Sequence, residues 1–224
     1  MARTMTDIKL IIFDLDGTLV DSLDDLTDAT NFMLGSFGRR SLTSREVRLL
    51  VGQGAKRLVE RAMPDATPDE VEQGVQLFLE YNDAHIVDKT RLYAGVKETL
   101  PRLGAYWRLG VVSNKYVAHC RKLLDVLEVG DYFTAVMGAD SCPQRKPSPE
   151  PILKLMADCG VAAAEAVIVG DSENDILAGK GAGIVTVGCT WGYGDLSELI
   201  DADYRIDSFA EILDLPVISI GQQA

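Results

Sequence analysis

Five short apolar runs, each closed by a polar residue or a glycine, constrain the fold of this 224-residue chain more than any other feature. Each run is too short for a helix and rich enough in β-branched residues for a buried strand. The expected strands span 10–14, 109–114, 133–138, 166–171 and 183–188, and segments with helical periodicity span 96–106, 116–127, 149–159 and 174–182. This alternation predicts an α/β fold, a Rossmann-like parallel sheet with helices on both faces.

Residues 18–90 do not follow this alternation, because their pattern is helical throughout. Thr43 and Glu46 match a capping box, and Thr67-Pro68 places proline at the first position of a helix. We expect helices over 21–37, 43–50, 54–62 and 68–85. The chain is therefore predicted to form an α/β core of residues 1–17 and 91–224 and a helical domain of residues 18–90. Two hinge segments, 17–20 and 88–93, are expected to join them.

The composition excludes several classes of function. A formal charge of −12 excludes a general binder of nucleic acid, because neutralising phosphate backbones requires a basic surface. Two histidines cannot form a three-histidine zinc site, and four cysteines without a CxxC pair indicate reduced thiols. We expect no signal peptide, and no apolar run comes near the ~20 residues that cross a bilayer. We expect a cytoplasmic monomer or homodimer without nucleic-acid or membrane partners.

Four carboxylates are expected at the carboxyl edge of the sheet, where open α/β folds bind ligands. Asp14 and Asp16 follow the first strand, and Gly17 permits a turn there. Asp171 closes the fourth run, and Asp175 lies one helical turn further on. Facing carboxylates repel each other unless a cation neutralises them or one of them keeps a proton. The set therefore suits Mg²⁺, which prefers oxygen ligands. The alternative is solvated strand ends and a helix N-cap.

Three further polar residues are candidates for binding an anion. Ser113 and Asn114 end the second strand, where hydroxyl and amide donors can hold phosphoryl oxygens. Lys146 is followed by prolines at 147 and 149, which fix the backbone and can direct its ammonium inward. The alternatives are a turn or helix cap at Ser113 and a solvated lysine before a helix. We expect His85 and His119 to lie on helix faces away from the chemistry.

Four motifs in this order resemble the haloacid dehalogenase superfamily of phosphohydrolases. They are DLDGT, VVSN, RKPSPEP and GDSEND, and they span almost the whole chain. The resemblance implies that Asp14 is the nucleophile, forming an aspartyl-phosphate, and that Asp16 is the acid and base. It implies Mg²⁺ on Asp14, the Asp16 carbonyl and Asp171, with Asp175 acting through a metal-bound water.

The same resemblance assigns the remaining candidate residues. Lys146 and Ser113 or Asn114 would stabilise the phosphoryl oxygens, and Lys146 would also hold Asp14 and Asp171. The helical domain would be a small cap that closes over the site. The segment VGQGAKRLVERAM at 51–63 resembles the phosphoglycolate phosphatase-like subfamily, which implies 2-phosphoglycolate as the substrate.

The cap also carries a cluster of positive charge, in residues 39–61. Helix N-termini bind anions, and Gly52-Gln53-Gly54 precedes a helix. We expect Gly52, Gln53 and either Lys56 or Arg57 to contact the carboxylate end of the substrate. The alternative is a solvated helix face with loose charge pairs.

Other functions stay open on the sequence alone. A sugar phosphomutase resembling β-phosphoglucomutase keeps the same motifs, and so do phosphatases of pyrophosphate and of other small metabolites. A non-catalytic binding protein would not need the complete set of acids.

Overall fold

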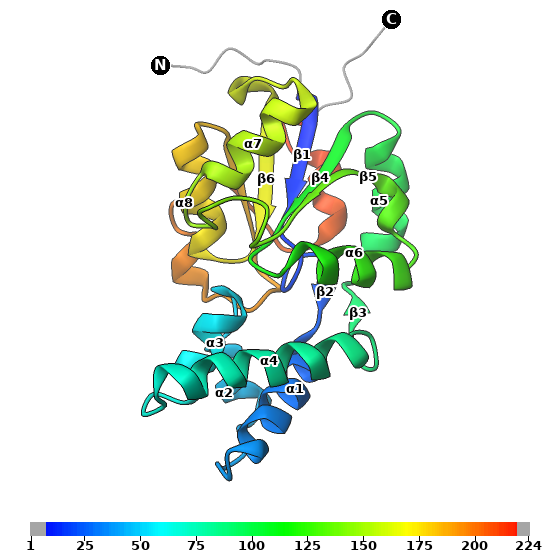
Figure 1. The fold of residues 1–224 in the computed structure, drawn as a ribbon. Coiled ribbons are helices and arrows are strands. Elements are labelled where there is room, and N and C mark those ends of the chain that lie inside the picture. The colour runs from blue at the N-terminus through cyan, green and yellow to red at the C-terminus, as the bar shows by residue number, and fades with distance from the viewer. Residues whose placement is uncertain (1–7, 219–224) are drawn as a thin grey trace, which may run out of the picture.

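The computed structural model describes residues 8–218, so the ends of the predicted core domain, 1–7 and 219–224, lie outside the described residues. Six parallel strands form one sheet in the order β5-β4-β1-β6-β7-β8 (Figure 1). They are β1 (Leu10–Phe13), β4 (Arg108–Val112), β5 (Phe133–Met137), β6 (Ala166–Gly170), β7 (Val185–Cys189) and β8 (Tyr204–Ile206). The predicted fold class is therefore confirmed.

Both faces of this sheet are buried, which explains why the strands are apolar at nearly every position. Strand β1 shows the alternation: Leu10 and Ile12 face one core, while Ile11 and Phe13 face the other. Helices α7 (Glu150–Cys159) and α8 (Glu173–Ala182) cover the first face. Helices α5 (Val96–Gly104) and α6 (Val117–Val126) cover the second, together with the short helix η4 (Phe209–Asp214).

The order of the strands reverses at β1. After β1 the chain builds β4 and β5 on one side, then crosses to β6, β7 and β8 on the other. Ligands of open α/β sheets bind at the carboxyl ends of the strands, at such a reversal. The carboxyl ends of β1, β4 and β6 are therefore the place to look for a site.

Four helices lie between β1 and β4 in the sequence and form a separate layer below the sheet (Figure 1). They are α1 (Leu23–Ser36), α2 (Ser44–Arg48), α3 (Gly54–Ala62) and α4 (Pro68–Ala84), and we call them the helical insert. A core of its own, which includes Leu26, Met33, Leu58 and Phe78, holds them together. The predicted capping box at Thr43 and the proline start of α4 are both confirmed, and Thr67 forms a second box with Glu70.

The two chain crossings between insert and sheet run side by side. Strand β2 (Val20–Asp21) pairs antiparallel with β3 (Arg91–Leu92). The buried carboxylate of Asp25, in the first turn of α1, accepts hydrogen bonds from the backbone N–H groups of Lys89 and Thr90. The start of the first insert helix is thereby tied to the returning chain. Whether the crossings act as hinges stays a prediction.

The sequence analysis missed β8, β2 and β3, because each is only two or three residues long and none is an apolar run. All four cysteines carry free thiols, as predicted. Within residues 8–218, no helix is long and apolar enough to cross a membrane.

Candidate active site

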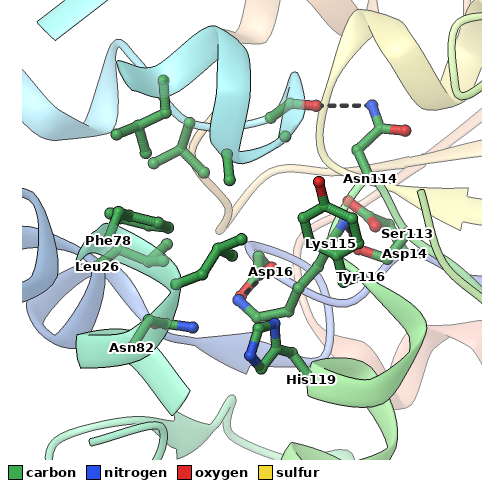
Figure 2. A pocket seen from close by; sticks show the side chains of 16 residues that line it. Asp14, Asp16, Leu26, Phe78, Asn82, Ser113, Asn114, Lys115, Tyr116 and His119 are labelled. Carbon is green, nitrogen blue, oxygen red and sulfur yellow. Dashed lines mark hydrogen bonds and ion pairs between the residues drawn. The ribbon is translucent and has the colours of Figure 1, made fainter. Parts of the chain in front are cut away.

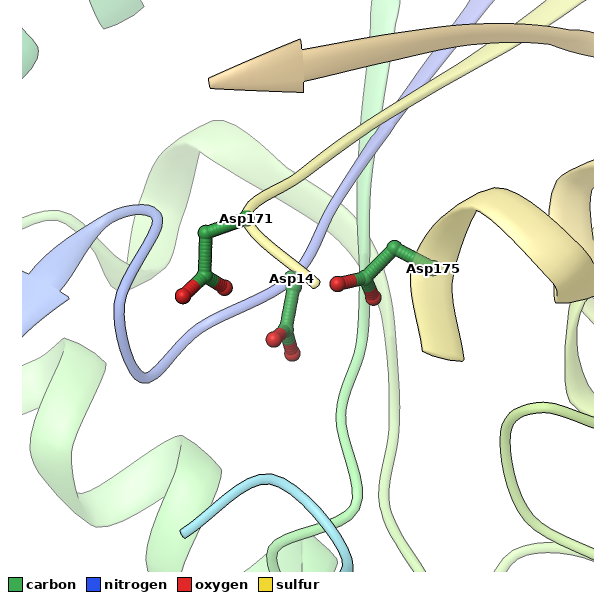
Figure 3. A group of neighbouring side chains, drawn as sticks. All are labelled: Asp14, Asp171 and Asp175. Carbon is green, nitrogen blue, oxygen red and sulfur yellow. The ribbon is translucent and has the colours of Figure 1, made fainter. Parts of the chain in front are cut away.

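Three of the four predicted acids meet at the carboxyl edge of the sheet (Figure 3). Asp14 follows β1, Asp171 follows β6, and Asp175 lies in the first turn of α8. One oxygen from each carboxylate lies within 4.8 Å of the others. Asp171 and Asp175 are buried. Neighbouring parallel strands end at the same edge, so residues 157 positions apart in the sequence, Asp14 and Asp171, become neighbours.

Lys146 supplies the positive charge of this acidic cluster. Its side chain is 2% exposed, and its Nζ lies 2.9 Å from Asp14 Oδ1 and 2.6 Å from Asp175 Oδ1. Nζ also donates to the carbonyl oxygen of Val112, at 2.5 Å. Burial lowers the pKa of Lys146, but the attraction of Asp14 and Asp175 outweighs it and leaves the pKa raised. The expected inward direction of the ammonium is confirmed. The expected contact of Lys146 with Asp171 is wrong, because Lys146 pairs with Asp175 instead.

One ammonium does not balance three carboxylates. Burial raises the pKa of Asp14 to about 6, partly opposed by Lys146. Burial, followed by repulsion from Asp14 and Asp175, raises the pKa of Asp171 to about 8. A divalent cation would supply the missing charge, and a set of carboxylate oxygens is the ligand chemistry of Mg²⁺. The residues present therefore fit such an ion.

A loop after β7, which the sequence analysis did not single out, holds Asp171 in place. Oδ2 of Asp171 accepts hydrogen bonds from the backbone N–H groups of Tyr193 at 2.6 Å and Gly194 at 3.3 Å. The loop packs so closely that a Cβ on Gly192 would lie 2.2 Å from the Asp171 Cβ. Gly17, whose φ is +91°, also approaches Asp171 closely, since a Cβ there would lie 2.3 Å from Asp171 Oδ2. The glycines at 192 and 194 were the signal in the sequence.

Asp16 does not join the acidic cluster. Its side chain turns to Lys115, whose Nζ lies 3.0 Å from both carboxylate oxygens, and Ser22 Oγ donates to Oδ1 at 2.5 Å. Both side chains of the pair are mostly buried, with exposures of 9% for Lys115 and 13% for Asp16. The sequence analysis did not single out Lys115.

The two candidates after β4 differ in what they can bind. Ser113 is buried, and its Oγ accepts from the Lys115 N–H at 3.3 Å, which leaves its own proton free to donate. The amide nitrogen of Asn114 donates to the carbonyl oxygens of Gly52 and Lys146, each at 2.9 Å. Its two donors are thus engaged, so the expected contact of Asn114 with phosphoryl oxygens is wrong for this structure. Asn114 instead joins the insert to the core.

A cavity of about 60 Å³ lies between the sheet edge and the insert (Figure 2). This volume is several times the ~10–15 Å³ that one water needs, which suits a small ligand. The core contributes its polar wall, and the insert contributes a mostly apolar wall. The core residues are Asp14, Asp16, Ser113, Asn114, Lys115, Tyr116 and His119, and the insert residues include Leu26, Val51, Gly52, Leu58, Phe78 and Asn82.

The cavity corrects several expectations. Gly52 lines it, but Gln53, Lys56 and Arg57 do not. Lys56 and Arg57 are exposed, and Arg57 forms an ion pair with Glu60. His119 was expected away from the chemistry, yet it lines the cavity from α6.

A family model described as haloacid dehalogenase-like hydrolase matches residues 11–189. The chain is 37% identical over 226 residues to a phosphoglycolate phosphatase of Vibrio parahaemolyticus, covering 96% of this chain and 99% of the relative. It is 40% identical over 193 residues to phosphoglycolate phosphatase 1 of Pseudomonas aeruginosa, covering 83% and 70%. A crystal structure of a predicted phosphoglycolate phosphatase from Haemophilus somnus matches with a TM-score of 0.89 and 36% identity, covering 94% and 99%.

Proposed function

The chain belongs to the haloacid dehalogenase-like hydrolases, and we propose that it is a Mg²⁺-dependent phosphatase of small phosphate monoesters, with 2-phosphoglycolate as the favoured substrate. Relatives named phosphoglycolate phosphatase, which align with 83% and 96% of the chain, support this substrate. The observation that carries the proposal is the buried acidic cluster of Asp14, Asp171 and Asp175 with Lys146, facing a cavity that also contains Asp16.

In the first step, an oxygen of Asp14 attacks phosphorus and forms an acyl phosphate. The bond between phosphorus and the leaving oxygen breaks, and Asp16 gives that oxygen its proton. With a pKa of about 6, Asp14 is mainly ionised above neutral pH, as a nucleophile requires. The ammonium of Lys146, which touches Asp14, is placed to stabilise charge on the phosphoryl oxygens. Ser113 keeps a proton for the same oxygens.

In the second step, water attacks phosphorus and Asp16 takes its proton. The bond between phosphorus and Asp14 breaks, which releases phosphate and restores the carboxylate. Asp16 can serve in both steps because it belongs to the cavity wall and not to the acidic cluster. Its return to the acid form completes the cycle.

Asp14, Asp171, Asp175 and the backbone carbonyl of Asp16 are the residues that would hold Mg²⁺. When bound, the ion draws negative charge off the phosphoryl group and helps align the attack. Both oxygens of Asp175 already have partners, since Oδ1 pairs with Lys146 and Oδ2 accepts from Ser172. We assign it chiefly to holding Lys146.

We further propose that residues 18–90 act as a cap over the site. Its wall of the cavity is mostly apolar, which would exclude water while the acyl phosphate forms. The paired crossings β2 and β3 would be the place where the cap moves.

The test is release of inorganic phosphate from 2-phosphoglycolate with and without Mg²⁺. We expect Asp14→Asn to abolish release and Asp16→Asn to slow it by about 100- to 10,000-fold. Asp158→Asn is the matched control, because this acid lies exposed on α7 and pairs only with Lys154 among the described contacts. Wild-type turnover in Asp14→Asn would refute the assignment. Isomerised sugar phosphate in place of free phosphate would identify a phosphomutase instead.

A further inference from the structure

Lys115 is the one lysine or arginine among the residues that line the cavity, within the part of the chain that the structure describes. It lies in the loop between β4 and α6, on the polar wall (Figure 2). His119 adds no second full charge, because burial and then the nearby Lys115 lower its pKa. Any anionic group of a substrate that lies in this cavity, apart from the phosphoryl group, therefore has Lys115 as its cationic partner.

Three basic residues of the insert have partners away from the cavity. Arg48 donates to the carbonyl oxygens of Gly192 and Tyr193, and Arg61 donates to that of Leu49. Arg57 pairs with Glu60 on the same helix. The insert wall that faces Lys115 is mostly apolar, as Leu26, Leu58 and Phe78 show.

At present the ammonium of Lys115 is satisfied by Asp16. Nζ lies 3.0 Å from each of its carboxylate oxygens, and the side chain is only 9% exposed. A mostly buried ammonium requires a charged or polar partner, so it leaves Asp16 only for another anion. Asp16 would still keep the hydrogen bond from Ser22 Oγ. The geometry therefore allows the Lys115 ammonium to exchange Asp16 for another anion.

We propose that Lys115 recognises the carboxylate of the substrate and, by moving to it, frees Asp16 to transfer protons. This rests on the proposed phosphatase function and names the residue that makes it selective for a carboxylate-bearing monoester. Ethyl phosphate lacks the carboxylate, so it leaves Lys115 on Asp16, where the ammonium occupies the oxygens that must handle the proton. Selectivity and activation then come from one side chain.

The test compares 2-phosphoglycolate with ethyl phosphate, in the presence of Mg²⁺, for the wild type and for Lys115→Met, Lys115→Gln and Lys115→Arg. Loss of one charge-assisted contact predicts that the ratio of kcat/KM between the two substrates falls about 10- to 100-fold in Lys115→Met. Lys115→Gln gives the same measurement if the methionine variant does not fold. Lys115→Arg keeps a cation and should keep part of the selectivity.

Lys154→Met is the matched control, because Lys154 is exposed on α7 and pairs with Asp158. An unchanged ratio in Lys115→Met and Lys115→Gln, with a wild type that favours 2-phosphoglycolate, would overturn the role of Lys115 and leave the phosphatase intact. So would a ratio that falls only in Lys56→Met or Arg57→Met. A wild type that hydrolyses ethyl phosphate as well as 2-phosphoglycolate would refute the proposed substrate itself, and the role of Lys115 with it.

Discussion

Replacing Lys146 by methionine should destabilise the fold in a way that depends on pH. The ammonium lies 2.9 Å from Asp14 and 2.6 Å from Asp175, and its side chain is 2% exposed. Methionine retains the apolar stem of lysine, so little stability is lost through an empty space in the packing. Most of the loss comes from leaving the buried carboxylates without a counter-ion. Removing one partner of a buried pair costs about 3–5 kcal/mol. For a protein of this length, that lowers Tm by about 6–20 °C.

The assay is urea unfolding of wild type and variant in EDTA at pH 7.5 and pH 5.5. At the lower pH the carboxylates take up protons and need less compensation, so the difference in unfolding free energy should shrink. Lys154→Met is the control: its exposed pair with Asp158, four residues along α7, is worth about 0.3–0.5 kcal/mol. A loss below about 1 kcal/mol for Lys146→Met, or the same loss at both pH values, would contradict this account of the cluster.

Three further predictions concern the same site. The pKa values of Asp14 and Asp171 are raised to about 6 and about 8. Above about pH 4, these two groups therefore hold more protons in the folded protein than in the unfolded chain, so the free energy of unfolding in EDTA should fall as the pH rises from 5 to 8. Urea titrations with Mg²⁺ should show a smaller fall. Gly192→Ala places a Cβ 2.2 Å from the Asp171 Cβ, and calorimetry should show Mg²⁺ affinity about 10- to 100-fold weaker, whereas unchanged affinity would exclude a positioning role for the loop. Asn114→Ala removes two hydrogen bonds, one of them to Gly52 of the insert, and should lower the unfolding free energy by about 1–3 kcal/mol. An unchanged unfolding free energy would mean that these hydrogen bonds do not stabilise the protein.

The fold could be predicted largely from local patterns, for identifiable reasons. Strand β1 is buried on both faces, so its apolar run is continuous and easily recognised. Thr43 and Thr67 mark two helix starts through side chains that cap their own backbone. Strand β8 lacks such a signal, because Tyr204 and Arg205 precede its one fully buried residue, Ile206. Its place follows from pairing with β7, which depends on the whole chain.

The site was predictable where strand ends fix the side chains and unpredictable where the insert meets the core. Asp14 and Asp171 follow adjacent strands, so the parallel register alone brings them together. Lys56 and Arg57 illustrate the opposite case. The buried face of α3 is set by Leu58 and Val59, which leaves the two basic residues exposed. A count of charges along a helix does not say which face meets the cavity.

The charges at the sheet edge also predict the order in which the cation and the substrate bind. Of the nine lysines, all of which lie in the described part of the chain, Lys146 and Lys115 are among the least exposed, and both are bound by carboxylates. The acidic cluster holds three carboxylates, those of Asp14, Asp171 and Asp175, beside the one ammonium of Lys146, and a divalent cation would supply the missing positive charge. The long-range field of a protein with charge −12 repels a phosphate monoester, and salt screens that field beyond about 8–10 Å. Attraction of the substrate must therefore be local, and it is complete only once the cation has neutralised the carboxylates. We expect Mg²⁺ to bind before the phosphorylated substrate.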